Sequence, residues 1–187
     1  MDGFAHDLVC KAQRGQTAAF AELIRRYERT ALAIAYACTG DSDRAADATQ
    51  EAFMWAWKQI RSLREPGRFG GWLASIVRNT ALTHVRRAQC RPTRSLPEAH
   101  VDPRPAADPA AQAARRELGQ QIDAAIQALD ELSRSAVVLR YYQGLSSREI
   151  ADLLGISPQA VDMRLCRARQ ELRTRLVPRP APCECSR

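Results

Sequence analysis

A proline-rich segment near the middle of the chain divides the sequence into two parts. Five prolines fall within the 22 residues from Cys90 to Ala111, and this segment has almost no apolar periodicity. Proline lacks a backbone N–H and fixes φ, so a segment of this composition forms neither a long helix nor the interior of a sheet. We expect residues 89–112 to form a semi-extended, flexible linker between two folded domains.

The part before the linker, residues 1–88, has the periodicity of an all-helical domain. Apolar residues recur at steps of three and four through residues 17–37, which is typical of an amphipathic helix. Ser42 is expected to cap a further helix, and a loop with one proline and three glycines precedes a last helix that reaches about Arg87. The expected buried positions are Phe20, Leu23, Ile24, Tyr27, Ala31, Ile34, Phe53, Trp57, Ile60, Leu73, Ile76, Val77 and Thr80.

The part after the linker, residues 113–177, is predicted to be a second helical domain that ends in a helix-turn-helix. A serine at 146 or 147 can cap a short helix, Gly155 permits a tight turn, and Ser157 caps the next helix with Pro158 at its first position. Two helices joined in this way form a helix-turn-helix. Its expected apolar positions are Ile150, Leu153, Leu154, Val161, Leu165, Ala168 and Leu172.

The outer side of the last helix carries polar and methyl-bearing side chains, with arginines on both flanks. This arrangement suits the major groove of DNA, because polar groups can meet base edges while cations lie near the two phosphate backbones. The alternative is a solvated basic helix face, which the helix-turn-helix context disfavours. We expect contacts to DNA from Ser157, Gln159, Asp162, Met163, Arg164, Arg167 and Arg169.

The positive charge of the chain is concentrated in two segments. The formal net charge is +7, and residues 63–94 carry 7 basic and 1 acidic side chains, while residues 131–187 carry 10 and 6. A concentrated positive charge favours a polyanionic partner. Catalysis is not expected, because the three histidines are scattered and the sequence contains neither a phosphate-binding loop nor a paired acid and base.

The sequence contains neither a long apolar run nor a signal peptide, so we expect a cytoplasmic protein without a membrane span. Its six cysteines should be reduced there, and most are expected to be small core residues. Cys183 and Cys185 have a spacing that can bind a soft metal, but we favour a disordered tail at residues 178–187 without a metal or other cofactor.

Three stretches, QEAFMWAWKQI, GRFGGWLASIVRNTALTHVRR and ALDELSRSAVVLRYYQGLSSREIADLLGISPQAVDMRLCRAR, resemble bacterial RNA polymerase sigma factors of the extracytoplasmic-function (ECF) group. The resemblance implies a subunit that binds core RNA polymerase through its clamp helices and flap and directs promoter-specific transcription initiation. The first domain would open the −10 element of promoter DNA, and the second would recognise the −35 element. An anti-sigma factor is an expected partner, whereas a small-molecule substrate or direct insertion into a membrane is not expected.

The resemblance also implies roles for residues of the first domain. Trp55 would be an interface anchor or a side chain folded against its own domain, and the family more often has a polar or basic residue there. Trp72 is expected in the core rather than stacked on a base, and His84 is expected to be packed rather than catalytic. The residues implied to bind polymerase are Asp47, Gln50, Glu51, Trp55 and Lys58. Those implied to bind the −10 element are Arg64, Arg68, Arg78, Asn79, Arg86 and Arg87.

The sequence departs from the family at Asp162, where a basic residue is usual. A carboxylate accepts a hydrogen bond from cytosine N4 but repels phosphate, so we expect an unusual −35 preference. A second class of function stays open, namely a free-standing helix-turn-helix regulator whose first domain senses a ligand or dimerises. The two classes differ in whether the chain binds core polymerase.

Overall fold

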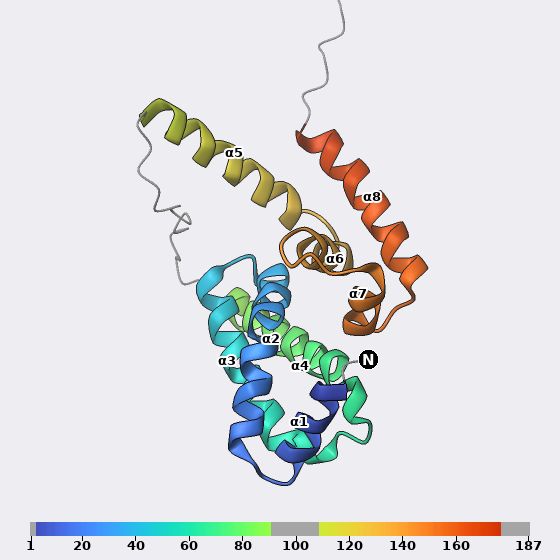
Figure 1. Cartoon of the computed structure of the whole chain (residues 1–187). Coiled ribbons are helices and arrows are strands. Elements are labelled where there is room, and N and C mark those ends of the chain that lie inside the picture. Colours follow the sequence, from blue (N-terminus) through green and yellow to red (C-terminus); the bar gives the residue numbers. More distant parts are fainter. Residues whose placement is uncertain (1–2, 91–108, 177–187) are drawn as a thin grey trace, which may run out of the picture.

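The computed structural model describes residues 3–90 and 109–176, with side chains described for residues 5–88 and 116–176. The secondary structure within these ranges is helical, without β-strands, which confirms the predicted all-α fold of two helical domains (Figure 1). None of the helices in the described ranges is long and apolar enough to cross a lipid bilayer.

The first domain is built around one long central helix, α2. The other helices pack on α2 because its apolar side chains, such as Leu23 and Ile34, repeat on more than one face and are fully buried. The cap of α3 is Asp41 rather than Ser42: its carboxylate accepts from the Arg44 backbone N–H at 2.9 Å, so the expected cap was wrong by one residue. The elements are α1 (Gly3–Gln13), α2 (Thr17–Thr39), α3 (Ser42–Gln59), η1 (Ile60–Ser62), η2 (Pro66–Arg68) and α4 (Phe69–Cys90).

The second domain contains the predicted helix-turn-helix. Helix α4 continues to Cys90 and α5 begins at Pro109, so helical structure extends into both ends of the expected linker, and residues 91–108 lie outside the described ranges. Helices α6 and α7 lie next to the first domain, whereas α5 and α8 extend away from it (Figure 1). The elements are α5 (Pro109–Gln127), α6 (Glu131–Tyr141), α7 (Ser147–Leu154) and α8 (Pro158–Leu176).

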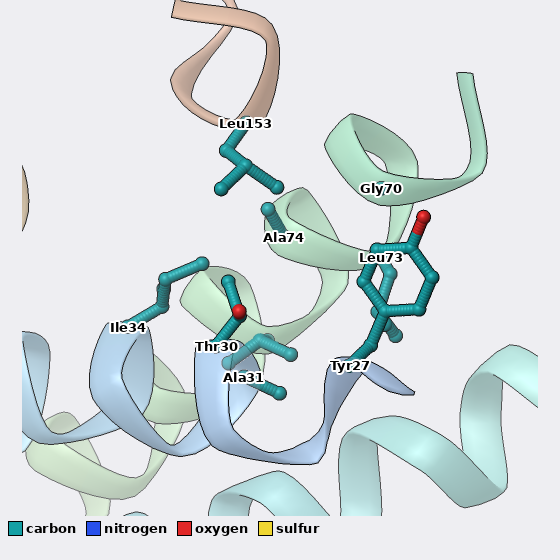
Figure 2. A pocket seen from close by; sticks show the side chains of 9 residues that line it. Tyr27, Thr30, Ala31, Ile34, Gly70, Leu73, Ala74 and Leu153 are labelled. Carbon is teal, nitrogen blue, oxygen red and sulfur yellow. The ribbon is translucent and has the colours of Figure 1, made fainter. Parts of the chain in front are cut away.

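The two domains dock against each other, α6 on α2 and α7 on α4, and share one continuous cluster of buried apolar residues. Leu153 was expected inside the helix-turn-helix, but its side chain points from α7 toward Ala74 of α4 and Ile34 of α2 (Figure 2). The hollow that remains there measures about 10 Å³. Because ligand pockets usually measure at least about 300 Å³, the seam has no room for the small molecule that a ligand-sensing regulator would bind.

The docked helices approach so closely that a side chain would not fit at one position. A Cβ atom built on Gly71 of α4 would lie 2.5 Å from the backbone oxygen of Asp152 in α7. A half-exposed ion pair also crosses the seam, with 3.5 Å between Arg78 Nε and Glu131 Oε1. Docking of the two domains therefore depends mainly on apolar burial and on the absence of a side chain at Gly71, since an ion pair of this exposure contributes at most about 1 kcal/mol.

Cys38 is buried on α2, while Cys166 is exposed on α8, so the expectation that cysteines lie in the core holds for the first and fails for the second. Burial, together with the charge of Glu131, raises the pKa of the Cys38 thiol to about 12. A thiol with that pKa is ionised in about one molecule in ten thousand at pH 8, and the thiolate is the reactive form.

In the folded protein, iodoacetamide at pH 8 is therefore expected to alkylate Cys166 long before Cys38. In denaturant the two cysteines should react at similar rates, which is the control. Peptide mass mapping over time measures the alkylation rates of both cysteines. Equal rates in the folded protein would contradict the buried position of Cys38 at the docked seam.

Candidate nucleic-acid interface

The helix-turn-helix is held together by local caps and a small apolar core. Ser146 caps α7 and forms a capping box with Glu149, and Gly155 ends the helix with φ of 69°. The Ser157 hydroxyl then accepts from the Ala160 N–H at 3.2 Å, at the start of α8. These features are as predicted, with Ser146 rather than Ser147 as the cap. The buried side chains of the pair are Ile150, Ala151, Leu154, Val161, Leu165 and Ala168.

The outer face of α8 is exposed, as predicted from the spacing of its polar and apolar residues. Met163 is 54% exposed, and the polar side chains around it are exposed as well. This face points away from the buried stripe that packs on α6 and α7, so the protein leaves it open to a partner. Its exposed members among the predicted DNA-contacting residues are Ser157, Gln159, Asp162, Met163, Arg167 and Arg169.

Two of the predicted DNA-contacting side chains pair with side chains from other parts of the second domain. The carboxylate of Asp162 accepts a hydrogen bond from the hydroxyl of Ser147 at 2.5 Å. Arg164 Nη1 lies 3.0 Å from Oδ1 of Asp130, the residue that caps α6. Partial burial raises the pKa of Asp130, but hydrogen bonds from Ser133 and the charge of Arg164 outweigh it and lower that pKa. Asp130 is therefore ionised near neutral pH, and Arg164 is held beside it.

A groove between α3 and α4 forms the second candidate surface. It brings the predicted −10 residues Asn79 and Arg87 together with Glu51 and Trp55, which were expected to bind polymerase. Trp55 is 51% exposed, so the alternative that it folds into its own domain does not describe this structure. The groove is lined by Glu51, Trp55, Gln59, Ser62, Trp72, Ile76, Asn79, Thr80, Thr83 and Arg87.

Trp72 lies between the apolar core and the groove, and contacts both. Its ring centroid lies 5.9 Å from that of Phe69, and it packs on the apolar core as expected. It also lines the groove and is only partly buried. Aromatic rings and amides beside an arginine are the groups that hold unpaired bases, so the groove has the composition of a single-strand binding surface.

Glu51 is positioned by His84 of the neighbouring helix. The His84 Nε2 and Glu51 Oε2 atoms are 2.7 Å apart, and both residues are partly buried. The expectation that His84 is packed agrees with this position, but its partner 33 residues away was not predicted. Glu51 is thus less available to a partner than its exposed neighbours on α3, which are Asp47, Gln50, Met54, Trp55 and Lys58.

The loop between α3 and α4 is fixed by a residue that sequence reasoning missed. Gln13 of α1 donates from Nε2 to the backbone oxygens of Ile60 and Leu63, at 3.0 and 2.7 Å. Arg68 pairs with Glu65 at 2.7 Å on the exposed side of this loop. A glutamine on the first helix carries no local signal for such a contact, because the contact depends on how the helices pack.

The predicted −10 residues do not all lie together. Asn79 and Arg87 line the groove, and Arg64, Arg68 and Arg86 are exposed outside it. Arg78 instead faces the second domain, where it pairs with Glu131. Docking of the two domains therefore occupies one of the arginines that would contact DNA.

Among the described residues, no group of three or more histidine, cysteine, aspartate or glutamate side chains is arranged to hold a metal ion. Cys183 and Cys185, together with the rest of the tail, lie outside the described ranges.

Family profiles match both domains. Residues 23–91 match Sigma-70 region 2, and residues 119–172 match Sigma-70 region 4. The first match covers most of α2, then α3, the loop and α4, and the second covers the last nine residues of α5, then α6, α7 and α8 as far as Leu172. The two surfaces described above thus lie in two regions of one family, in the order that the sequence predicted.

Curated relatives belong to the same family. The probable RNA polymerase sigma factor RfaY of Xanthomonas campestris is 34% identical over 96% of this chain and 46% of that relative. The ECF sigma factor SigE of Mycolicibacterium smegmatis is 36% identical over 83% of this chain and 61% of the relative. This chain therefore spans less than two thirds of the length of these two relatives. The ECF sigma-E factor of Escherichia coli is 31% identical over 91% of this chain and 93% of its own length.

Solved structures share the fold. CnrH, solved in complex with the cytosolic domain of CnrY, aligns with a TM-score of 0.66 and 27% identity over 91% of this chain and 96% of CnrH. The sigma factor RpoE of Bartonella quintana was solved with the anti-sigma factor NepR. It aligns with a TM-score of 0.59 and 22% identity over 84% of this chain and 96% of RpoE. The profile matches and the curated relatives, whose fold these structures share, show that the chain belongs to the ECF group of RNA polymerase sigma factors.

Proposed function

We propose that this chain binds core RNA polymerase and directs promoter-specific transcription initiation in the cytoplasm. Its first domain opens the −10 element, and its second domain recognises the −35 element. The observation that carries the proposal is the pair of separate exposed surfaces, the outer face of α8 and the groove between α3 and α4, each within a region of the sigma-70 family.

The groove supports the assignment of −10 opening to the first domain. Strand opening exposes bases that must be held away from their partners, and accessible tryptophan rings with a neighbouring amide and arginine can hold them by stacking and hydrogen bonding. Trp72, Asn79 and Arg87 supply these groups in one place. The exposed arginines Arg64, Arg68 and Arg86 would neutralise phosphates of the displaced strand.

The exposed face of α3 supports the assignment of polymerase binding. An exposed tryptophan next to charged residues is the composition of an interface anchor. We also propose that an anti-sigma factor covers one or both of these surfaces, by analogy with the complex of the sigma factor RpoE and the anti-sigma factor NepR.

Charge reversal of Lys58 is expected to weaken binding to core polymerase about tenfold or more, as at an interface hot spot. Lys58 lies exposed on α3, beside Trp55. The matched control is Lys11→Glu, since Lys11 is the other lysine of the chain and lies exposed on α1, away from α3. Titration of the labelled variants with purified core polymerase measures the dissociation constant of each. If the parent chain does not bind core polymerase, or if the two variants weaken binding equally, the assignment is wrong.

A further inference from the structure

Asp162 is fixed by a hydrogen bond that joins the two helices of the helix-turn-helix. Its Oδ1 accepts from Oγ of Ser147, which lies in the first turn of α7, at 2.5 Å. The two residues are 15 positions apart, so the bond depends on how α8 packs across α7. The carboxylate is thereby held in one orientation on a helix face where its neighbours are exposed.

Ser147 also accepts a hydrogen bond from Arg140 of α6. Arg140 donates from Nη2 to Oγ of Ser147 at 2.8 Å and from Nη1 to the backbone oxygen of Leu145 at 2.9 Å. A guanidinium group only donates and a carboxylate only accepts, so the proton of the Ser147 hydroxyl must point toward Asp162. Arg140, Ser147 and Asp162 form a directed chain of hydrogen bonds that ends on the outer face of α8.

One oxygen of the carboxylate is left to contact a partner. Within the described ranges, Oδ2 of Asp162 has neither a hydrogen-bond partner nor an ion-pair partner. Gln159 and Met163, the neighbours of Asp162 on this face, are exposed too. A carboxylate oxygen in the major groove requires a donor on the base edge, and it is repelled by the acceptors of guanine and thymine.

The chemistry of the base edges favours cytosine over adenine. In the major groove cytosine offers its N4 amino group, whereas adenine places the N7 acceptor beside its N6 amino group. A fixed carboxylate would be repelled by that N7 atom. Because Ser147 restricts Asp162 to one orientation, the carboxylate cannot easily turn away from an unfavourable edge.

We propose that Arg140 and Ser147 orient Asp162 so that its free oxygen selects a cytosine in the −35 element. Asp162 is then a specificity-determining residue, and Ser147 is a positioning residue that acts through it. The inference rests on the proposed promoter recognition by the second domain and adds the base that is selected and the side chain that enforces the selection.

The experiment is transcription by reconstituted holoenzyme from a promoter library that is randomised across the −35 element. The parent chain should favour cytosine at one position about tenfold over thymine or guanine, as expected for one charge-assisted hydrogen bond. Asp162→Asn should abolish this preference, because a carboxamide can present a donor as well as an acceptor. Ser147→Ala should reduce it about threefold or more, and Ser147→Thr, which keeps the hydroxyl, should retain it.

A merely structural role for Ser147 would lower initiation from every promoter and leave the base distribution unchanged. That outcome overturns the inference, as does a parent chain that favours no cytosine at any −35 position. The inference is supported if Ser147→Ala reduces the cytosine preference at one −35 position and leaves the base preferences at the other positions as in the parent chain. Absence of initiation from the whole library overturns the proposed function instead, and the inference falls with it.

Discussion

Replacing Phe69 with alanine is expected to lower the free energy of unfolding by about 3–5 kcal/mol, the usual cost of removing a buried aromatic side chain. Phe69 is 1% exposed at the first position of α4. Its ring centroid lies 5.3 Å from that of Tyr27 on α2 and 5.9 Å from that of Trp72 on α4 itself, so the truncation removes contacts to two aromatic rings at once. Urea denaturation followed by circular dichroism measures the loss.

The matched control is Trp55→Ala, which removes a larger aromatic side chain from the exposed face of α3. Because Trp55 is half exposed, its truncation should change the free energy of unfolding by less than about 1 kcal/mol. Equal losses for the two variants would mean that the ring of Phe69 is not packed as described. Comparing the two variants thus distinguishes Phe69, which stabilises the fold, from Trp55, which is available to a partner.

Gly71→Ala is expected to lower the free energy of unfolding by about 1–3 kcal/mol, the usual cost of overpacking. The added Cβ would lie 2.5 Å from the backbone oxygen of Asp152, and a backbone atom of a packed helix cannot turn aside. The two domains must therefore move apart along the contact between α4 and α7. Denaturation measures the loss, and small-angle X-ray scattering should show a larger radius of gyration.

Gly119→Ala is the matched control for Gly71→Ala, because both glycines lie inside helices. A Cβ on Gly119 would have no neighbour within 4 Å, so alanine should stabilise α5 by up to about 1 kcal/mol. Stabilisation by both substitutions would contradict the close approach of α4 and α7.

Separation of the domains should not harm initiation. The −10 and −35 elements are centred roughly 25 base pairs apart, which is about 85 Å of B-form DNA. In the docked arrangement α7 touches α4 directly, and α8 packs on α7. If both surfaces bind DNA as proposed, docking would have to be released when the promoter is bound, because surfaces on helices that pack on one another lie closer together than the two elements. Gly71→Ala is accordingly expected to support as much initiation as the parent chain.

Local sequence signals predicted the helix-turn-helix well. Serines at the helix starts, Gly155 in the turn and the apolar spacing along α8 act over a few residues, and the structure has each of them in place. The cap of α3 shows the limit of such signals. Asp41 and Ser42 are adjacent and both can cap a helix, so the sequence could not distinguish them.

Contacts between distant parts of the chain could not be predicted. Leu153 fits the apolar stripe of α7, yet its side chain packs on the first domain. Asp162 was expected to contact DNA, and its hydrogen bond from Ser147 was not predicted; nor was the pairing of Arg78 with Glu131, which crosses between domains. Each depends on the relative placement of helices that are far apart in sequence, and helical periodicity carries no information about that placement.

The central claim is that this chain directs promoter-specific initiation by core RNA polymerase. The most direct test is transcription in vitro with purified core polymerase and fragmented genomic DNA, followed by sequencing of the 5′ ends of the transcripts. The start sites are expected to share a −10 and a −35 element, to appear only when the chain is present, and to carry cytosine at a fixed place in the −35 element. Transcripts that start at the same sites with and without the chain would contradict it.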